Sequence, residues 1–144
     1  CLAEGRGELV RALPRFPQVK VLLAAPAGLK LSTAQVYGYL NLDKIPETKA
    51  TTELFDYLAG NKKSPGNSWE EICKILDNHL ELPVFYRCKE VALLKQQLLC
   101  RGLPALLSGS GPTVFALSRE EQKLQGVGSD LAAQGYKVIL TETI

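Results

Sequence analysis

A pair of glycines between two apolar runs, in LLSGSGPTVFAL at residues 106–117, restricts how this chain can fold. Gly109 and Gly111 bracket Ser110, and glycine adopts positive φ at little cost, so the pattern predicts a tight backbone bend. The β-branched and aromatic residues that follow favour a strand. We therefore predict a strand, a side-chain-poor loop and a second strand, with free backbone N–H groups that can donate hydrogen bonds to an anion. A bare hairpin turn without a ligand is the alternative.

The glycine pattern excludes two well-known phosphate-binding motifs. A phosphate loop of the GxxxxGK(S/T) kind needs a lysine after its last glycine and then a helix, and neither is present. A dinucleotide fingerprint needs GxGxxG at the start of a helix, whereas position 114 is Val and leads into a predicted strand. What remains is a glycine loop between two strands.

Length, composition and charge are those of a single cytoplasmic domain that does not bind nucleic acid. The 144 residues amount to one domain's worth of chain and can form a core. No apolar run approaches the roughly 20 residues of a transmembrane helix, and no signal-peptide pattern argues for export, so we expect a cytoplasmic protein. The net charge of +2 is too small to indicate nucleic acid. The first fifty residues hold seven Lys or Arg against four Asp or Glu, which suits a small anionic ligand or simply a solvated face.

The cysteines and the missing methionine give two further expectations. Cys1, Cys73, Cys88 and Cys100 form no CxxC pair. We therefore expect buried, reduced thiols rather than a disulfide framework or a metal site. The sequence contains no Met and begins with Cys, which predicts that it is a piece of a longer protein.

Turn and strand signals divide the first part of the chain. Residues 5–7 predict the tip of a hairpin, and two prolines suggest a boundary near residues 14–18. The apolar run 19–26 predicts a strand buried on both faces. Ser32 to Gln35 match a capping box that starts a helix, with Val36, Tyr39 and Leu40 on one face. The N–H groups of Ser32 and Thr33 serve either this helix start alone or also an anion.

Helical spacing and capping patterns predict four more helices and a last strand. The helices run over 52–59, from Ser68, from 85 or 89 to Arg101, and from Ser118, and the strand runs over 136–144. Their predicted inward residues are Leu54, Phe55, Leu58, Trp69, Ile72, Ile75, Leu76, Val91, Leu94, Leu98, Leu124, Val127 and Leu131. Gly102 should end the third of these helices, and Gly126 and Gly128 should weaken the fourth. The order predicts an α+β, ferredoxin-like split β-α-β fold with a helical insertion.

Several segments resemble one family of kinases. LLSGSGPTVFAL resembles the third signature of the GHMP kinases, which include galactokinase, homoserine kinase and mevalonate kinase. AEGRGE at 3–8, VLLAAPAGLKLSTAQVY at 21–37 and NHLE at 78–81 are similar to one branch of that family, whose own form of the last motif is N-D-L-E. That branch transfers the γ-phosphoryl group of ATP to the 2-hydroxyl of a cytidine-diphosphate sugar alcohol, in the non-mevalonate route to isoprenoid precursors.

The resemblance implies which residues bind what. Residues 1–17 would be a remnant of the N-terminal kinase domain, and residues 18–144 would be the C-terminal domain. The phosphates of ATP, with Mg²⁺ in the parent enzyme, would face Ser108, Gly109, Ser110, Gly111, Pro112 and Thr113. The cytidine-diphosphate substrate would contact Ser32 and Thr33. The parent enzyme would act in the cytoplasm, or in the plastid stroma of a plant or alga.

The same resemblance implies that the catalytic groups lie elsewhere. The family's catalytic lysine, main ATP loop and catalytic aspartate would belong to the missing N-terminal domain, so we expect no catalytic residue and no metal ligand in this chain. The fragment alone should therefore be inactive. His79 stands where the family has the Asp of N-D-L-E, and its role stays open.

Two other functions fit the sequence. One is a different GHMP kinase of small molecules, against which the S-T-A start of the predicted helix argues. The other is a stand-alone ferredoxin-like module that binds a small anion or mediates assembly, because this fold serves many functions.

Overall fold

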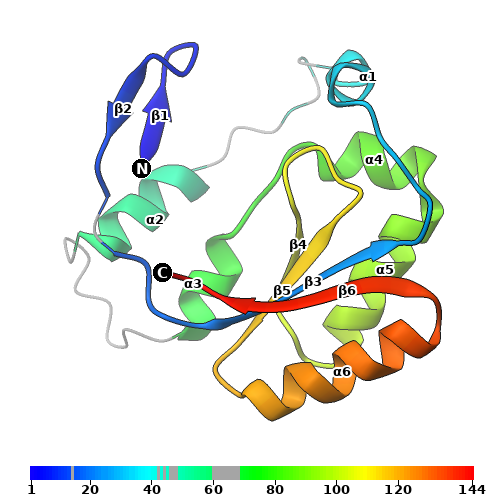
Figure 1. The fold of residues 1–144 in the computed structure, drawn as a ribbon. Coiled ribbons are helices and arrows are strands. Elements are labelled where there is room, and N and C mark those ends of the chain that lie inside the picture. The colour runs from blue at the N-terminus through cyan, green and yellow to red at the C-terminus, as the bar shows by residue number, and fades with distance from the viewer. Residues whose placement is uncertain (14, 42, 44, 46–48, 60–68) are drawn as a thin grey trace. The chain divides into compact units, whose positions relative to one another are not determined.

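The chain divides into two compact units. The computed structural model describes residues 1–13, 15–41, 43, 45, 49–59 and 69–144. Unit 1 comprises residues 1–17 and 46–77, and unit 2 comprises residues 18–45 and 78–144 (Figure 1). The cut at Pro17 falls inside the boundary predicted from the prolines. That residues 1–17 are the remnant of another domain stays a prediction.

Unit 1 contains the predicted hairpin. Strands β1 (Leu2–Glu4) and β2 (Leu9–Arg11) pair antiparallel. Gly5 and Gly7 have φ of +68° and +101°, and the Gly7 N–H donates to the Glu4 carbonyl over 3.1 Å. These positive φ values explain why the turn contains glycine.

Two helices complete unit 1. They are α2 (Ala50–Leu58) and α3 (Trp69–Ile75), which contact each other. Ile72 is buried as predicted, but Leu54, Phe55, Leu58, Ile75 and Leu76 are only partly buried. Ser68 and the side chain of Trp69 lie outside the described part of the chain.

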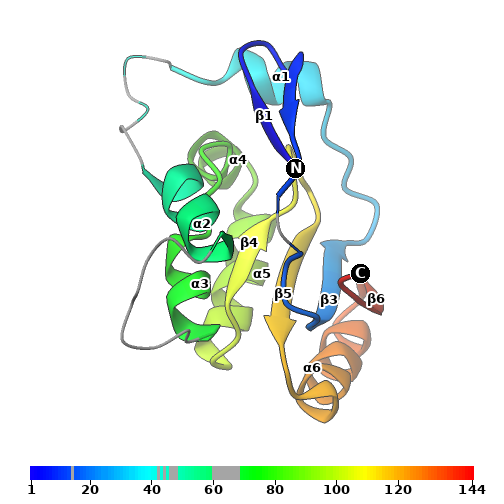
Figure 2. The ribbon, with the colours of Figure 1, turned by 90° about the vertical axis from the view of Figure 1, so that its left-hand side faces the viewer.

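Unit 2 has the predicted ferredoxin-like topology. Its sheet is formed by β3 (Lys20–Pro26), β4 (Ala105–Leu107), β5 (Val114–Ser118) and β6 (Tyr136–Glu142), in the antiparallel order β4-β5-β3-β6 (Figure 2). Helix α5 (Lys89–Cys100) lies between β3 and β4 in the chain, and α6 (Glu121–Ala133) lies between β5 and β6. The insertion after β3 adds α1 (Thr33–Gly38) and α4 (Glu81–Arg87) to this unit.

The core of unit 2 lies between α5, α6 and one face of the sheet. Leu22 and Ala24 of β3 are 0% and 1% exposed and join a cluster with the predicted inward residues of both helices: Val91, Leu94, Leu98, Leu124, Val127 and Leu131. Alternate residues of a strand point to opposite faces, and Leu23 and Ala25 are accordingly only partly buried. The prediction that this strand is buried on both faces is therefore wrong along part of its length.

The helix predicted to start at 85 or 89 begins at the later position, because α5 starts at Lys89, and a separate helix, α4, precedes it. Cys88 has φ −120° and ψ 80°, and this extended residue separates α4 from α5. Pro83 lies in the first turn of α4, where a missing N–H costs little. Gly102 ends α5 as predicted: it has φ +67°, and the Leu103 N–H donates to the Leu98 carbonyl over 3.1 Å.

The predicted start of α6 is wrong. Ser118 is the last residue of β5, and its hydroxyl accepts the Glu120 N–H over 3.0 Å, so α6 begins at Glu121 and not at Ser118.

Tyr39, from the predicted face of the first helix, is the C-cap of α1 and is 40% exposed. Its ring packs against the Arg87 guanidinium, 3.8 Å from the ring centroid.

The four cysteines are less buried than predicted, and the described helices fit the absence of a predicted membrane span. Cys1 and Cys100 are exposed and Cys73 and Cys88 are partly buried, all four as free thiols, so the expected burial of every thiol is wrong. Cys1 is the terminal residue, and Cys100 lies in the last turn of α5 off the face of Leu94 and Leu98. Within the described ranges, no helix combines the length and apolar character that a membrane span needs.

A charged cluster lies at the end of the sheet remote from the glycine loop. The Lys20 ammonium is 2.8 Å from a carboxylate oxygen of Glu142 and 3.2 Å from one of Glu121. The hydrogen bond to Glu142 raises the pKa of Lys20 above its usual value, and Lys20 lowers the pKa of Glu142. Lys20 pairs with Ser118 while Ala24 pairs with Val114, so these shifted groups do not act on residues 108–113.

Gly128 allows α6 to pack closely on the sheet. A Cβ atom at this position would lie 3.2 Å from Leu22 Cδ1 and 3.3 Å from Val138 Cγ1, which is tighter than an ordinary contact. At Gly126, in the same helix, a Cβ would meet nothing within 4 Å. Both glycines lower the helix propensity of α6, but only Gly128 is needed for its packing on the sheet.

We predict opposite effects of filling these two positions. Gly126→Ala should raise the free energy of unfolding by up to about 1 kcal/mol, because alanine favours the helix and meets open space. Gly128→Val should lower it by about 1–3 kcal/mol, because the added atoms overpack the helix–sheet contact. Urea unfolding followed by circular dichroism measures both. A stabilising effect of Gly128→Val would contradict the close contact of Gly128 with Leu22 and Val138.

Candidate functional site

The glycine loop, residues 108–113, joins β4 to β5 at one end of the sheet of unit 2. The Ser108 N–H donates to the Thr113 carbonyl over 2.8 Å, and the Gly111 N–H donates to the Ser108 carbonyl over 2.9 Å. Strand, loop and strand follow one another as predicted. Two of the N–H groups expected to be free are thus used to close the turn. In the described part of the chain, no protein group accepts the N–H of Gly109 or Ser110.

Both loop glycines have a left-handed backbone. Gly109 has φ +55° and Gly111 has φ +75°. A Cβ at Gly111 would lie 2.9 Å from Leu107 Cδ1, whereas a Cβ at Gly109 would meet nothing within 4 Å. Leu107 belongs to the core and is 1% exposed, so it has little room to move. Gly111 is therefore required both for its φ and for close packing.

The structure brings the two sets of predicted site residues together. The Thr33 Oγ1 lies 2.9 Å from the Ser110 Oγ, and either hydroxyl can donate. This bond joins the start of α1 to the glycine loop across 77 residues of sequence. Both Thr33 and Ser32 are exposed.

Ser32 begins α1 as predicted but does not form a capping box. Its side chain makes no capping hydrogen bond, and only its carbonyl acts, accepting the Val36 N–H over 3.0 Å. The Ser32 hydroxyl is therefore not committed to the helix start. Both residues predicted to contact substrate are exposed, and Thr33 is bonded to the loop.

Side chains before and within α4 hold the loop in place, a role that no sequence pattern indicated. Asn78 Nδ2 donates to the carbonyls of Leu107, over 2.9 Å, and Gly109, over 2.8 Å. Glu81 Oε1 accepts the Leu107 N–H over 2.9 Å. Both residues belong to the NHLE segment, which only the family resemblance had singled out as a functional segment.

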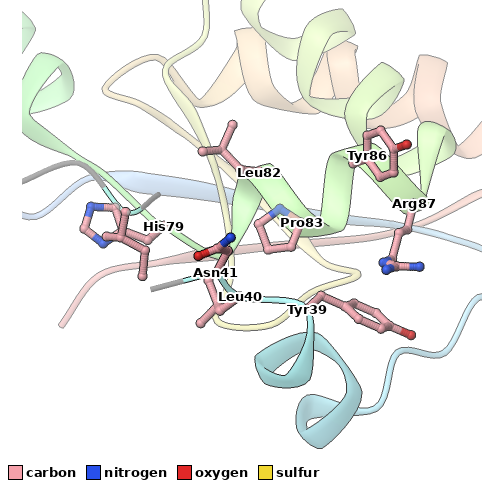
Figure 3. Close-up of a pocket in the computed structure, with 9 residues that line it drawn as sticks. Tyr39, Leu40, Asn41, His79, Leu82, Pro83, Tyr86 and Arg87 are labelled. Atoms are coloured by element: carbon pink, nitrogen blue, oxygen red, sulfur yellow. The ribbon is translucent and has the colours of Figure 1, made fainter. Parts of the chain in front are cut away.

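One cavity of unit 2 is lined by residues other than Asn78, Glu81 and the loop. It has a volume of about 240 Å³ and is lined by Tyr39, Leu40, Asn41, Ile45, His79, Leu82, Pro83, Tyr86 and Arg87 (Figure 3). None of the predicted site residues lines it. His79 lines this cavity, whereas Asn78 and Glu81 do not. Among the described residues, no group of three metal-binding side chains occurs.

A family model described as GHMP kinases C terminal matches residues 55–137, more than half of the chain. This chain belongs to the GHMP kinase family. The matched residues include the glycine loop and the NHLE segment. The family resemblance on which the residue assignments rest is thus confirmed, while the assignments themselves stay predictions.

Curated relatives within the GHMP kinases are named 4-diphosphocytidyl-2-C-methyl-D-erythritol kinase. The one from Pelobacter propionicus is 34% identical over 145 residues, which cover 99% of this chain and 48% of the relative. The one from Bacillus subtilis is 37% identical over 133 residues, 90% of this chain and 43% of the relative. The chain spans about half the length of the curated relatives it matches.

Solved structures of GHMP kinases share the fold. A crystal structure of 4-(cytidine 5'-diphospho)-2C-methyl-D-erythritol kinase aligns with a TM-score of 0.69 at 22% identity, over 97% of this chain and 48% of that one. L. major mevalonate kinase, crystallised with R-mevalonate, aligns with a TM-score of 0.65 at 14% identity, over 92% of this chain and 45% of that one. These likenesses confirm the predicted fold and do not distinguish between acceptors.

We predict that the two loop glycines differ in tolerance. Gly109→Ala should lower the free energy of unfolding by about 1–2 kcal/mol, the cost of a left-handed residue. Gly111→Ala should cost about 1–3 kcal/mol more, because its Cβ also overpacks against Leu107. Thermal and urea unfolding of the two variants measure the difference. Equal losses would show that Leu107 does not restrict the loop.

Proposed function

We propose that this chain supplies the C-terminal half of an ATP-dependent kinase, acting in the cytoplasm. Its acceptor would be the 2-hydroxyl of 4-diphosphocytidyl-2-C-methyl-D-erythritol, in the non-mevalonate route to isoprenoid precursors. The single observation that supports it best is the hydrogen bond between Thr33 and Ser110, because it places the predicted substrate residue beside the predicted phosphate loop. The names of the curated relatives supply the acceptor.

The geometry of the loop suits phosphoryl transfer. This reaction depends mainly on positioning and on neutralising charge, and fixed backbone N–H donors do both. The N–H groups of Gly109 and Ser110 are available for a phosphate oxygen, and the closed turn holds them in place. ATP brings the group that is transferred, and Mg²⁺ offsets its charge. No cluster of carboxylates in the described residues would hold that ion, so we place its protein ligands in the N-terminal half.

The division between two halves can be tested with a chimera. The first half of the Bacillus subtilis relative, which aligns at 37% identity, can be fused before this chain at the corresponding position. We expect the chimera to phosphorylate 4-diphosphocytidyl-2-C-methyl-D-erythritol with ATP, while the isolated 144 residues show no turnover and bind nucleotide weakly. A coupled ADP-release assay with each protein measures this.

The matched control is the chimera with Gly111→Val. We expect its kcat/KM to fall on the order of 100-fold, as when a preorganised donor is lost. Turnover by the isolated chain would overturn the division of labour. A folded chimera that accepts homoserine or mevalonate but not the cytidine-diphosphate alcohol would identify a different acceptor. A folded chimera without any kinase activity would favour an anion-binding or assembly module.

A further inference from the structure

The amide of Asn78 is fixed from both sides. Its Oδ1 accepts the Leu80 N–H over 3.0 Å at the start of α4, and its Nδ2 donates to the carbonyls of Leu107 and Gly109. Backbone carbonyls only accept and a backbone N–H only donates, so the orientation of this amide is determined by its partners. Asn78 therefore connects α4 rigidly to the glycine loop.

Glu81 holds the other backbone group of Leu107. Its Oε1 accepts the Leu107 N–H over 2.9 Å, and its Oε2 lies 2.6 Å from the Lys95 ammonium of α5. The side chains of Glu81 and Lys95 are only 15% and 17% exposed, so this ion pair is largely shielded from water. Strand β4 is the edge of the sheet, and its outward backbone groups need partners from outside the ladder.

We infer that Asn78 and Glu81 are positioning residues that aim the Ser110 N–H at the phosphate site. The Gly109 carbonyl and the Ser110 N–H belong to one peptide group and point in opposite directions in a trans peptide. By holding the carbonyl, Asn78 turns the N–H of Ser110 away from α4, where no group of the described residues accepts it. Glu81 fixes the strand end from which the loop departs. The effect on phosphate binding rests on the proposed function; the effect on the loop does not.

The residues of the NHLE segment contribute to two parts of unit 2. Asn78 contacts the loop and Glu81 contacts the strand end before it, whereas His79 lines the cavity with Tyr39 and Tyr86 (Figure 3).

The decisive variant is Asn78→Asp, which preserves the shape and the acceptor for the Leu80 N–H but removes both donors. Amide hydrogen exchange of the 144-residue chain, measured by NMR, should show at least about tenfold faster exchange of the Ser108 and Gly111 N–H groups. Asn78→Ala, which adds no charge, should give the same result. Glu81→Gln keeps an acceptor for the Leu107 N–H and should leave both rates within about twofold.

A control separates loop loosening from loss of global stability. Val127→Ala in α6 removes core packing without contacting the loop, and it should speed exchange of β3 and β6 amides at least as much as loop amides. Unchanged loop exchange in both Asn78 variants would overturn the inference. So would loop exchange that rises only in proportion to the β3 amides, as in the control.

The chimera provides the functional readout. Asn78→Asp should raise the KM for ATP about tenfold, while the KM for the cytidine-diphosphate alcohol stays within about twofold. Equal rises in both KM values would contradict a role in aiming a phosphate donor. If the unmutated chimera shows no activity, the proposed function fails, while the exchange measurement still decides whether Asn78 holds the loop.

Discussion

The hydrogen bonds to Leu107 are the interactions on which the rest of the site depends. Strand β4 has three residues and a partner on one side only, so its backbone alone cannot fix the loop that follows. Asn78 and Glu81 supply the missing partners for both backbone groups of Leu107. An edge strand that would otherwise fray is thereby held to α4, and through Lys95 to α5. The loop inherits its position from two helices as well as from the sheet.

The same residue links the loop to the hydrophobic core. The Leu107 side chain is 1% exposed within the core cluster, and its Cδ1 occupies the space beside Gly111. Side chain and backbone of one residue thus constrain the turn from two directions. A glycine loop is often regarded as flexible because it lacks side chains. Here the absence of a Cβ is what lets the loop sit tightly against a packed leucine.

Sequence patterns predicted local features well and contacts between distant segments poorly. Periodicity identified the buried faces of α5 and α6, and Gly102 identified where α5 ends, because these depend on neighbouring residues. One of the two starts predicted for α5, Lys89, is correct, whereas α4 was not predicted as a separate helix although its Pro83 fits a first helical turn. The contact of Thr33 with Ser110 spans 77 residues, and that of Asn78 with Gly109 spans 31. Such pairs follow from topology, which sequence periodicity does not encode.

The hydroxyls of Thr33 and Ser110 can donate a hydrogen bond to an anion whichever of the two is the donor in the bond between them. Thr33 and Ser110 each carry one hydroxyl hydrogen, and the bond between them uses one of the two. The other hydrogen remains to be donated outward, from Ser110 if Thr33 is the donor within the pair and from Thr33 in the opposite case. The site therefore always offers one O–H donor next to the Ser110 N–H. Two donors of this kind complement a phosphate oxygen better than a cation, and this favours phosphate binding over a bare turn.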